Sequence, residues 1–139
     1  MDFKEGVVLL VDKPYGWTSF DVVNKLRYVL RRKFDQKKFK IGHAGTLDPL
    51  ATGLLVLCTG KKTKEIEQYL SGIKTYTGSF LLGHETPSFD LESKFSIAEK
   101  PAQISDEKLQ AIAQSFTGEI LQTPPIFSAK KIGGKRAYE

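Results

Sequence analysis

The sequence contains a single cysteine, Cys58, and this scarcity excludes two classes of protein. One thiol cannot form a disulfide within the chain, and no second cysteine stands at the spacing of a metal-binding pair. Cys58 lies in the apolar run 54–58, so we expect a small buried hydrophobic residue. The chain is therefore neither a disulfide-stabilised scaffold nor a thiolate metalloprotein, and we predict no metal site.

Long apolar runs are also absent. No uninterrupted stretch reaches the roughly 20 residues that a membrane-spanning helix needs. Residues 1–5, MDFKE, are too acidic and polar to start a secretory signal peptide. We therefore expect a cytoplasmic protein without a membrane partner. With 139 residues, 40% hydrophobic content and no internal repeat or low-complexity tract, the chain is predicted to form one folded domain.

The glycine-rich motifs of nucleotide-binding proteins, G-x-x-x-x-G-K-[ST] and G-x-G-x-x-G, are missing. The chain has instead the segment 42–54, GHAGTLDPLATGL, which places His43 and Asp48 among three glycines. Glycine lets the backbone approach a ligand closely, and Pro49 biases Asp48 toward an extended conformation. One interpretation is a carboxylate held on a turn beside an imidazole. The other is a plain loop before a buried strand, and the local pattern leaves both open.

Positive charge exceeds negative charge. The chain has 21 Lys and Arg against 16 Asp and Glu, a formal charge of +5 and a pI near 9.3, which favours a polyanionic partner. The basic residues form two clusters, which are Arg27, Arg31, Arg32, Lys33, Lys37, Lys38 and Lys40, and Lys130, Lys131, Lys135 and Arg136. If both clusters line one groove, phosphate neutralisation dominates the affinity and makes binding salt-dependent.

The hydrophobic pattern predicts an α+β fold with a mixed, largely antiparallel central sheet and flanking helices. The continuous apolar runs 6–11 and 54–59 suit buried strands. Between them, Thr18 with an acidic residue three positions later resembles a capping box, and an apolar stripe continues to about Lys33. A short strand at 39–41 is expected to lead into the glycine-rich loop.

The remaining elements are predicted from period and turn signals. In chain order they are a helix over 63–70, an alternating strand over 74–82, a partner strand around Phe95 and Ile97, a helix between Ser105 and Gly118, a strand over 119–123 and a hairpin turn at Gly133-Gly134. The helix after Ser105 has Leu109, Ile112, Ala113 and Phe116 on the side expected to face the core. His84 is expected in a solvated loop.

Residues 42–55, GHAGTLDPLATGLL, closely resemble the active-site motif of the bacterial tRNA pseudouridine synthase B family. Further matches follow in the right order, namely 10–19 (LVDKPYGWTS), 74–76 (KTY), 82–83 with Thr86, Ser88 and Asp90, and 125–131 (PIFSAKK). The resemblance implies a pseudouridine synthase-like fold and an isomerase that converts uridine 55 in the tRNA T-arm stem-loop to pseudouridine after base flipping. It implies no cofactor and no obligate protein partner.

The resemblance also assigns roles to residues. Asp48 falls on the catalytic aspartate, which attacks either C6 of the base or C1′ of the ribose. His43 falls on the residue that fills the space left by the flipped base, and Tyr76 on the tyrosine that stacks on the target and is a candidate for removing the C5 proton. From the residues alone, His43 is equally a turn histidine bonded to backbone, and Tyr76 a core aromatic of a strand.

Supporting positions come from the same motifs. Lys13 is expected either to pair with an acid or to support the catalytic loop. The motif positions expected to shape that loop are Gly42, Gly45, Thr46 and Leu47. Residues 124–139 resemble the family's mobile RNA-gripping segment, which would bring Lys130, Lys131, Lys135 and Arg136 to the RNA backbone. The alternative for this segment is a solvated basic hairpin.

Two departures qualify the resemblance. Pro87 stands where the family's loop usually has an acidic residue. The matches cover about the first half of the family's catalytic domain, so we expect residues 1–139 to be a truncated, N-terminal portion. That portion would lack the strand whose arginine pairs with the catalytic aspartate and would lack a small C-terminal RNA-binding domain. We therefore expect it to be inactive or badly impaired by itself, with an unpaired sheet edge.

Two other functions remain open at this point. One is a non-catalytic RNA-binding module whose glycine loop is only structural. The other is a guide-RNA-dependent pseudouridine synthase of the dyskerin type, which shares the active-site motif. The test that separates them is whether the protein alone forms pseudouridine in a T-arm stem-loop.

Overall fold

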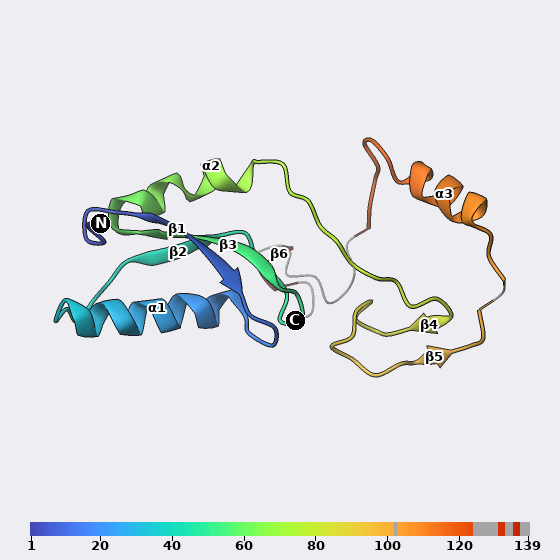
Figure 1. Ribbon diagram of the computed structural model, residues 1–139, viewed down its shortest axis with the longest axis horizontal. Coiled ribbons are helices and arrows are strands. Elements are labelled where there is room, and N and C mark those ends of the chain that lie inside the picture. The colour runs from blue at the N-terminus through green and yellow to red at the C-terminus, as the bar shows by residue number, and fades with distance from the viewer. Residues whose placement is uncertain (102, 124–130, 133–134, 137–139) are drawn as a thin grey trace. The chain divides into compact units, whose positions relative to one another are not determined.

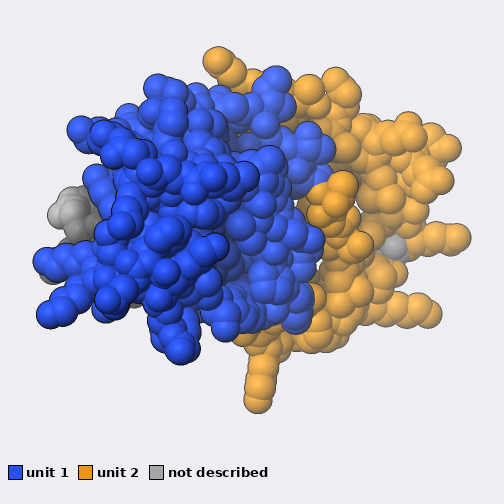
Figure 2. Space-filling model, turned by 60° about the vertical axis from the view of Figure 1, so that its left-hand side comes forward, with its two compact units in different colours: residues 1–76 blue, residues 77–139 orange. Residues whose placement is uncertain are grey.

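The computed structural model describes residues 1–101, 103–123, 131–132 and 135–136. The chain divides into two compact units, residues 1–76 and residues 77–139 (Figure 2). Both units combine helices with antiparallel strands, so the predicted α+β class is observed. The predicted parallel component of a mixed sheet is not found among the described strands, since each of their pairs is antiparallel.

Unit 1 is built on a three-stranded sheet with the strand order β1-β3-β2. Its strands are β1 (Val8–Lys13), β2 (Ile41–Ala44) and the central β3 (Gly53–Thr59). Both pairs are antiparallel, with Val11 opposite Leu55 and Ile41 opposite Thr59. Each outer strand has one edge without a partner strand in the described part of the chain.

Helix α1 (Ser19–Lys33) begins where the sequence predicts. Thr18 is its N-cap, and its hydroxyl accepts a hydrogen bond from the Asp21 N–H at 3.0 Å. The Asp21 carboxylate in turn accepts from the Thr18 N–H at 2.9 Å, which completes the capping box. Two of the N–H groups that a helix start leaves without partners are thereby satisfied, so the chain turns into the helix at this position.

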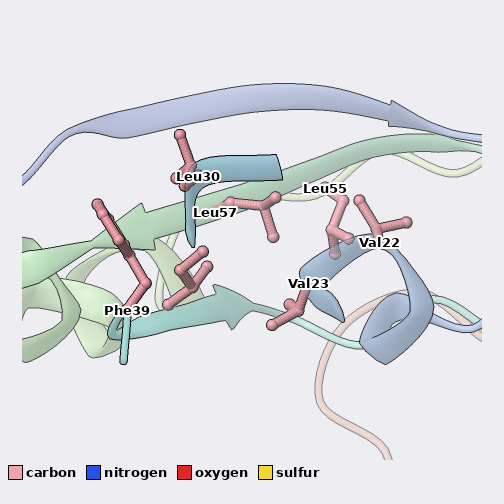
Figure 3. Packing of buried hydrophobic residues seen from close by; sticks show 7 residues of the cluster. Val22, Val23, Leu30, Phe39, Leu55 and Leu57 are labelled. Carbon is pink, nitrogen blue, oxygen red and sulfur yellow. The ribbon is translucent and has the colours of Figure 1, made fainter. Parts of the chain in front are cut away.

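The core of unit 1 lies between α1 and the sheet. Figure 3 shows Val22, Val23 and Leu30 of α1 directed toward Leu55 and Leu57 of β3. Phe39 and Ile41 complete this cluster. Side chains in a strand alternate between faces, so Leu55 and Leu57 share the face that α1 covers.

The other sheet face is covered at β2 by a second helix, α2 (Ile66–Leu70), which follows the 3₁₀ turn η1 (Gly60–Glu65) (Figure 1). The sequence predicts a helix over 63–70, and these residues are helical, the first three of them as the end of η1. Cys58 is fully buried on β3, which confirms its predicted place in the interior. Burial raises the pKa of the Cys58 thiol, because a thiolate is poorly stabilised away from water.

Unit 2 contains two short strand pairs and one helix. β4 (His84–Glu85) pairs with β5 (Ile97–Ala98), and β6 (Lys131–Ile132) with β7 (Lys135–Arg136). The second pair agrees with the predicted hairpin, whose turn at residues 133–134 lies outside the described residues. Helix α3 (Asp106–Ser115) is capped by the Ser105 hydroxyl, as predicted. Among the described residues no helix has both the length and the apolar character needed to cross a bilayer.

Three predictions for the second half of the chain are wrong. They are a strand over 74–82, a strand over 119–123 and a loop position for His84. Residues 74–82 form no strand, although their side chains alternate, and residues 119–123 are also irregular. A strand requires a partner for its backbone groups, and no described segment pairs with either one. The partner strand predicted near Ile97 exists but pairs with β4, so His84 lies on a strand and its ring contacts Phe95 at 4.7 Å.

The apolar side of α3 is exposed rather than buried. Leu109, Ile112 and Phe116 keep 39%, 46% and 68% of their surface accessible. The helical period correctly places these residues on one face. Helical period says nothing about which segment covers that face, and none of the described segments covers it.

Candidate active site

The loop 45–52 joins β2 to β3 and carries Asp48. Gly45 opens it with a φ of 95°, a conformation that residues with a Cβ rarely adopt. The Ala51 N–H donates to the Asp48 carbonyl at 3.0 Å and closes a turn over residues 48–51. Asp48 is thus presented on a turn, as the residue order Asp48-Pro49 predicts.

The residue before Asp48 is anchored by Ser19, the first residue of α1. The Ser19 hydroxyl accepts a hydrogen bond from the Leu47 N–H at 2.9 Å and donates to the Leu47 carbonyl at 3.2 Å. A hydroxyl can do both because it has one proton and two lone pairs. Ser19 is itself only 2% exposed, so water does not readily replace it. Both backbone groups of Leu47 are therefore held by one buried side chain.

The residue after Asp48 is anchored by Lys13 and Gly16. The Pro49 carbonyl accepts from Lys13 Nζ at 3.2 Å and from the Gly16 N–H at 2.9 Å. Lys13 Nζ also donates to the carbonyls of Pro14 at 3.2 Å and Trp17 at 2.5 Å.

The side chain of Lys13 is fully buried, and its three protons match three carbonyl acceptors. A buried ammonium needs such partners, because it loses its hydration when the chain folds. Of the two expectations for Lys13, the structure shows hydrogen bonds to loop carbonyls and no hydrogen bond or ion pair with an acid among the described residues.

The carboxylate of Asp48 is exposed. Among the described residues, no side chain or backbone group forms a hydrogen bond or an ion pair with it. The backbone on both sides is fixed while the carboxylate keeps its lone pairs free. This arrangement suits a nucleophile or a base, because the group is positioned and does not need to break a protein contact before it reacts.

His43 lies on β2, so the predicted limit of that strand at residue 41 is wrong: β2 also includes Gly42, His43 and Ala44. The half-buried His43 ring places Nδ1 2.6 Å from the Gly45 carbonyl oxygen. A carbonyl can only accept, so Nδ1 carries the proton and Nε2 is left as an acceptor in the neutral ring. No contact joins His43 to Asp48 among the described residues.

Close packing explains Gly42. A Cβ at this position would lie 2.6 Å from Cδ1 of Ile66 in α2, so the end of the Ile66 side chain would have to move to admit it. Of the other motif positions, Thr46 is exposed and Leu47 is half-buried. No group of three or more His, Cys, Asp or Glu side chains gathers at this loop or elsewhere in the described residues.

The family described as "TruB family pseudouridylate synthase (N terminal domain)" matches residues 31–139. The chain belongs to this family. Three proteins named tRNA pseudouridine synthase B illustrate the similarity. That of Phocaeicola vulgatus is 53% identical over 139 residues, covering 100% of this chain and 59% of the relative. That of Flavobacterium johnsoniae is 52% identical, covering 99% and 61%, and that of Chloroherpeton thalassium is 48% identical, covering 97% and 55%.

The chain spans about 60% of the length of these curated relatives. The residues matched to the TruB family include the Asp48 loop and Tyr76, whereas Lys13 and Ser19 lie before them. Both fall within the region shared with the relative from Phocaeicola vulgatus, which covers the whole chain.

The structure brings together only some of the expected site residues. Lys13 contacts the Asp48 loop, but Tyr76 is 72% exposed on an irregular segment and has no contact with Asp48 or His43 in the described chain. Of the basic residues expected to hold RNA, Lys130 lies outside the described residues. The other three lie on short strands, Lys131 on β6 and Lys135 and Arg136 on β7.

Sequence reasoning missed Ser19 and Gly16 as loop anchors. Both lie in the segment 10–19, which carries the family resemblance, but nothing local distinguishes them. Ser19 is 28 residues from Leu47, and only the folded chain brings them into contact.

Proposed function

We propose that this protein isomerises uridine to pseudouridine at position 55 in the T arm of tRNA, with Asp48 as the nucleophile. The observation that supports this proposal is the exposed carboxylate of Asp48, which has no partner among the described residues and lies between two anchored residues, Leu47 and Pro49. Membership of the TruB family and relatives named tRNA pseudouridine synthase B support the reaction and the substrate.

The reaction needs a nucleophile and a positioned base, and no oxidant or reductant. The bond between C1′ and N1 breaks, a bond between C1′ and C5 forms, C5 loses a proton and N1 gains one. The Asp48 carboxylate adds either to C6 of the base or to C1′ of the ribose, and both routes stay open. In either case the detached uracil must rotate before it rejoins the ribose, so a fixed nucleophile keeps the two parts together.

The other site residues have proposed roles in binding. A uridine stacked in an RNA helix is out of reach, so the target must be flipped out. His43, on β2 just before the loop, is proposed to fill the vacated space. Tyr76 is proposed to stack on the base and to accept the C5 proton, and its exposed ring is free of other ring contacts in the described residues. The basic segment 124–139 is proposed to bind the T-arm backbone.

Substituting Asp48 tests the nucleophile. The full-length Asp48→Asn variant should form pseudouridine at least about 10³-fold more slowly than wild type on unmodified tRNA, because an amide is not a nucleophile of comparable strength. Its tRNA affinity should change less than about threefold, because the phosphate contacts are unchanged. Pseudouridine is measured by mass spectrometry after nuclease digestion, and affinity by filter binding.

Asp35→Asn is the matched control, since it changes charge equally and sits at a φ of 48°, which Asn tolerates. It should retain wild-type turnover. Undiminished turnover by Asp48→Asn would overturn the assignment of Asp48, and parallel loss of turnover and affinity would count against a purely chemical role. The absence of pseudouridine with wild-type protein would favour a non-catalytic RNA-binding module. Turnover that requires an added guide RNA would favour the dyskerin-type alternative.

A further inference from the structure

The outer face of α1 carries a cluster of cations and aromatic rings that the proposed active site does not use. We call the α1 face the surface formed by Phe20, Asn24, Arg27, Tyr28, Arg31 and Arg32. Most of these residues are spaced by three, four, seven or eight positions, so they lie on one side of the helix. This side is turned away from the sheet, which α1 contacts through its buried stripe (Figure 1).

The positive charge of the chain is concentrated in the segment 24–40, which contains all three arginines of the α1 face. Residues 24–40 hold eight Lys and Arg and one Asp, a net charge of +7, whereas the whole chain carries +5. The rest of the chain is therefore slightly acidic, at −2. No arginine of the α1 face forms an ion pair with a carboxylate among the described residues, in contrast to Lys61 and Lys62, which pair with Glu5 and Glu65.

Two of the three arginines, Arg27 and Arg32, are held in position by aromatic rings. The Arg27 guanidinium lies 5.8 Å from the centre of the Phe20 ring, and that of Arg32 lies 5.5 Å from the Tyr28 ring. Arg32 also donates to the Tyr28 hydroxyl at 2.9 Å, and Arg27 to the Asn24 side chain at 2.6 Å. A guanidinium that is already ordered loses less entropy when it binds an anion.

Helix stability does not account for this face. The helix dipole favours cations in the last turn, which explains Arg31 and Arg32 but not Arg27. Arg27 and Arg31 are four residues apart, and like charges at this spacing destabilise a helix by a few tenths of a kcal/mol. Phe20 and Tyr28 also leave 58% and 56% of their surface exposed. The acid on this side of α1, Asp21, is engaged by Thr18 at the helix start. A solvated helix face is expected to carry more acids among the cations and fewer exposed rings.

We propose that the α1 face binds the phosphate and ribose backbone of an RNA helix, outside the loop that carries Asp48. Its unpaired cations complement phosphates, and its ordered guanidinium groups suit two-pronged contacts with phosphate oxygens. The choice of RNA among polyanions rests on the proposed function, and tRNA supplies the duplex. Backbone contacts carry little sequence information, so the α1 face contributes affinity rather than base selection.

The test compares two triple variants of the full-length protein that lose equal charge. One is Arg27→Gln, Arg31→Gln and Arg32→Gln. The control, Lys4→Gln, Lys61→Gln and Lys64→Gln, removes three exposed lysines outside the α1 face. The dissociation constant of tRNA is measured by filter binding at several salt concentrations. The arginine variant should bind at least about tenfold more weakly at 0.1 M salt, and its slope of log K against log salt should fall by about 2 to 3, about one for each phosphate that is no longer neutralised. The control should bind within about threefold of wild type.

Two further variants keep the test decisive if the triple arginine variant folds poorly. Arg31→Gln alone removes a side chain with no hydrogen bond or ring contact in the described chain, and it should lower the salt slope by about 1. Replacing the three arginines by lysine keeps the charge and should retain most of the slope. Equal weakening by the arginine and control variants, or as much weakening with lysine as with glutamine, would overturn the proposal.

The tRNA affinity is measured separately from the rate of pseudouridine formation. A protein that forms no pseudouridine would overturn the proposed function while leaving these affinities interpretable. Normal turnover with unchanged affinity in the arginine variant would overturn the α1 face alone. Phosphatidylserine vesicles provide the last comparison. Vesicle binding that is abolished in the arginine variant, together with unchanged tRNA affinity, would assign the α1 face to a membrane surface instead.

Discussion

Ser19→Ala tests whether the anchoring of the Asp48 loop matters for catalysis. The substitution removes two hydrogen bonds to Leu47, at 2.9 and 3.2 Å. Each is worth about 0.5–1.5 kcal/mol net, so the free energy of unfolding should fall by about 1–3 kcal/mol. The neighbouring Asp48 also loses its fixed position. A displacement of about 1 Å can cost on the order of 100-fold in rate, so kcat should fall by about 10- to 100-fold.

The assay separates positioning from folding. Urea unfolding gives the stability, single-turnover kinetics on tRNA give the rate of the chemical step, and filter binding gives the tRNA affinity, which should stay within about threefold. The control is Ser71→Ala, which removes an exposed hydroxyl that donates to the Gln68 carbonyl at 3.0 Å and should cost less than about 0.5 kcal/mol. Loss of the expected stability with a wild-type rate of chemistry would show that the Ser19 contact does not position Asp48.

Three further predictions concern stability, measured by urea or thermal unfolding. Lys13→Met leaves three loop carbonyls without their ammonium donor and should lower the free energy of unfolding by about 2–4 kcal/mol. The control, Lys25→Met at an exposed position, should lower it by under about 0.5 kcal/mol. A loss under about 1 kcal/mol for Lys13→Met would contradict the anchoring role. Gly42→Ala places a Cβ 2.6 Å from Ile66 Cδ1, the end of a side chain that can rotate away, and should cost under about 1 kcal/mol. This cost should fall by at least half in an Ile66→Val background, and simple additivity of the two substitutions would contradict the predicted contact. Hydrogen bonds from the N-cap threonine lower the pKa of Asp21, so the stabilisation that Asp21 provides is present at neutral pH and is lost as pH falls below about 4. The melting temperature of Asp21→Ala should therefore lie below that of wild type at pH 7 and meet it near pH 2. An unchanged difference in melting temperature at pH 2 would contradict this linkage.

Local patterns predicted the elements whose stabilising contacts are also local. The capping box at Thr18 lies within three residues of sequence, and the stripe that continues through Val23 to Leu30 follows from helical spacing alone. Similarly, the apolar run that contains Cys58 became the central strand. By contrast, the alternation over 74–82 did not produce a strand, because backbone hydrogen bonds to a second segment are needed and alternation cannot supply that segment.

Residue order alone was enough to identify the family of the chain, the turn that carries Asp48 and the start of α1. Each of these depends on residue order within a short segment, such as the bias that Pro49 places on Asp48. The anchoring of the loop is visible only in the folded chain, since Ser19 reaches Leu47 across 28 residues and Lys13 reaches Pro49 across 36. Hydrogen bonds between distant segments depend on how the sheet and helix pack, and that packing is not encoded in the spacing of any local motif.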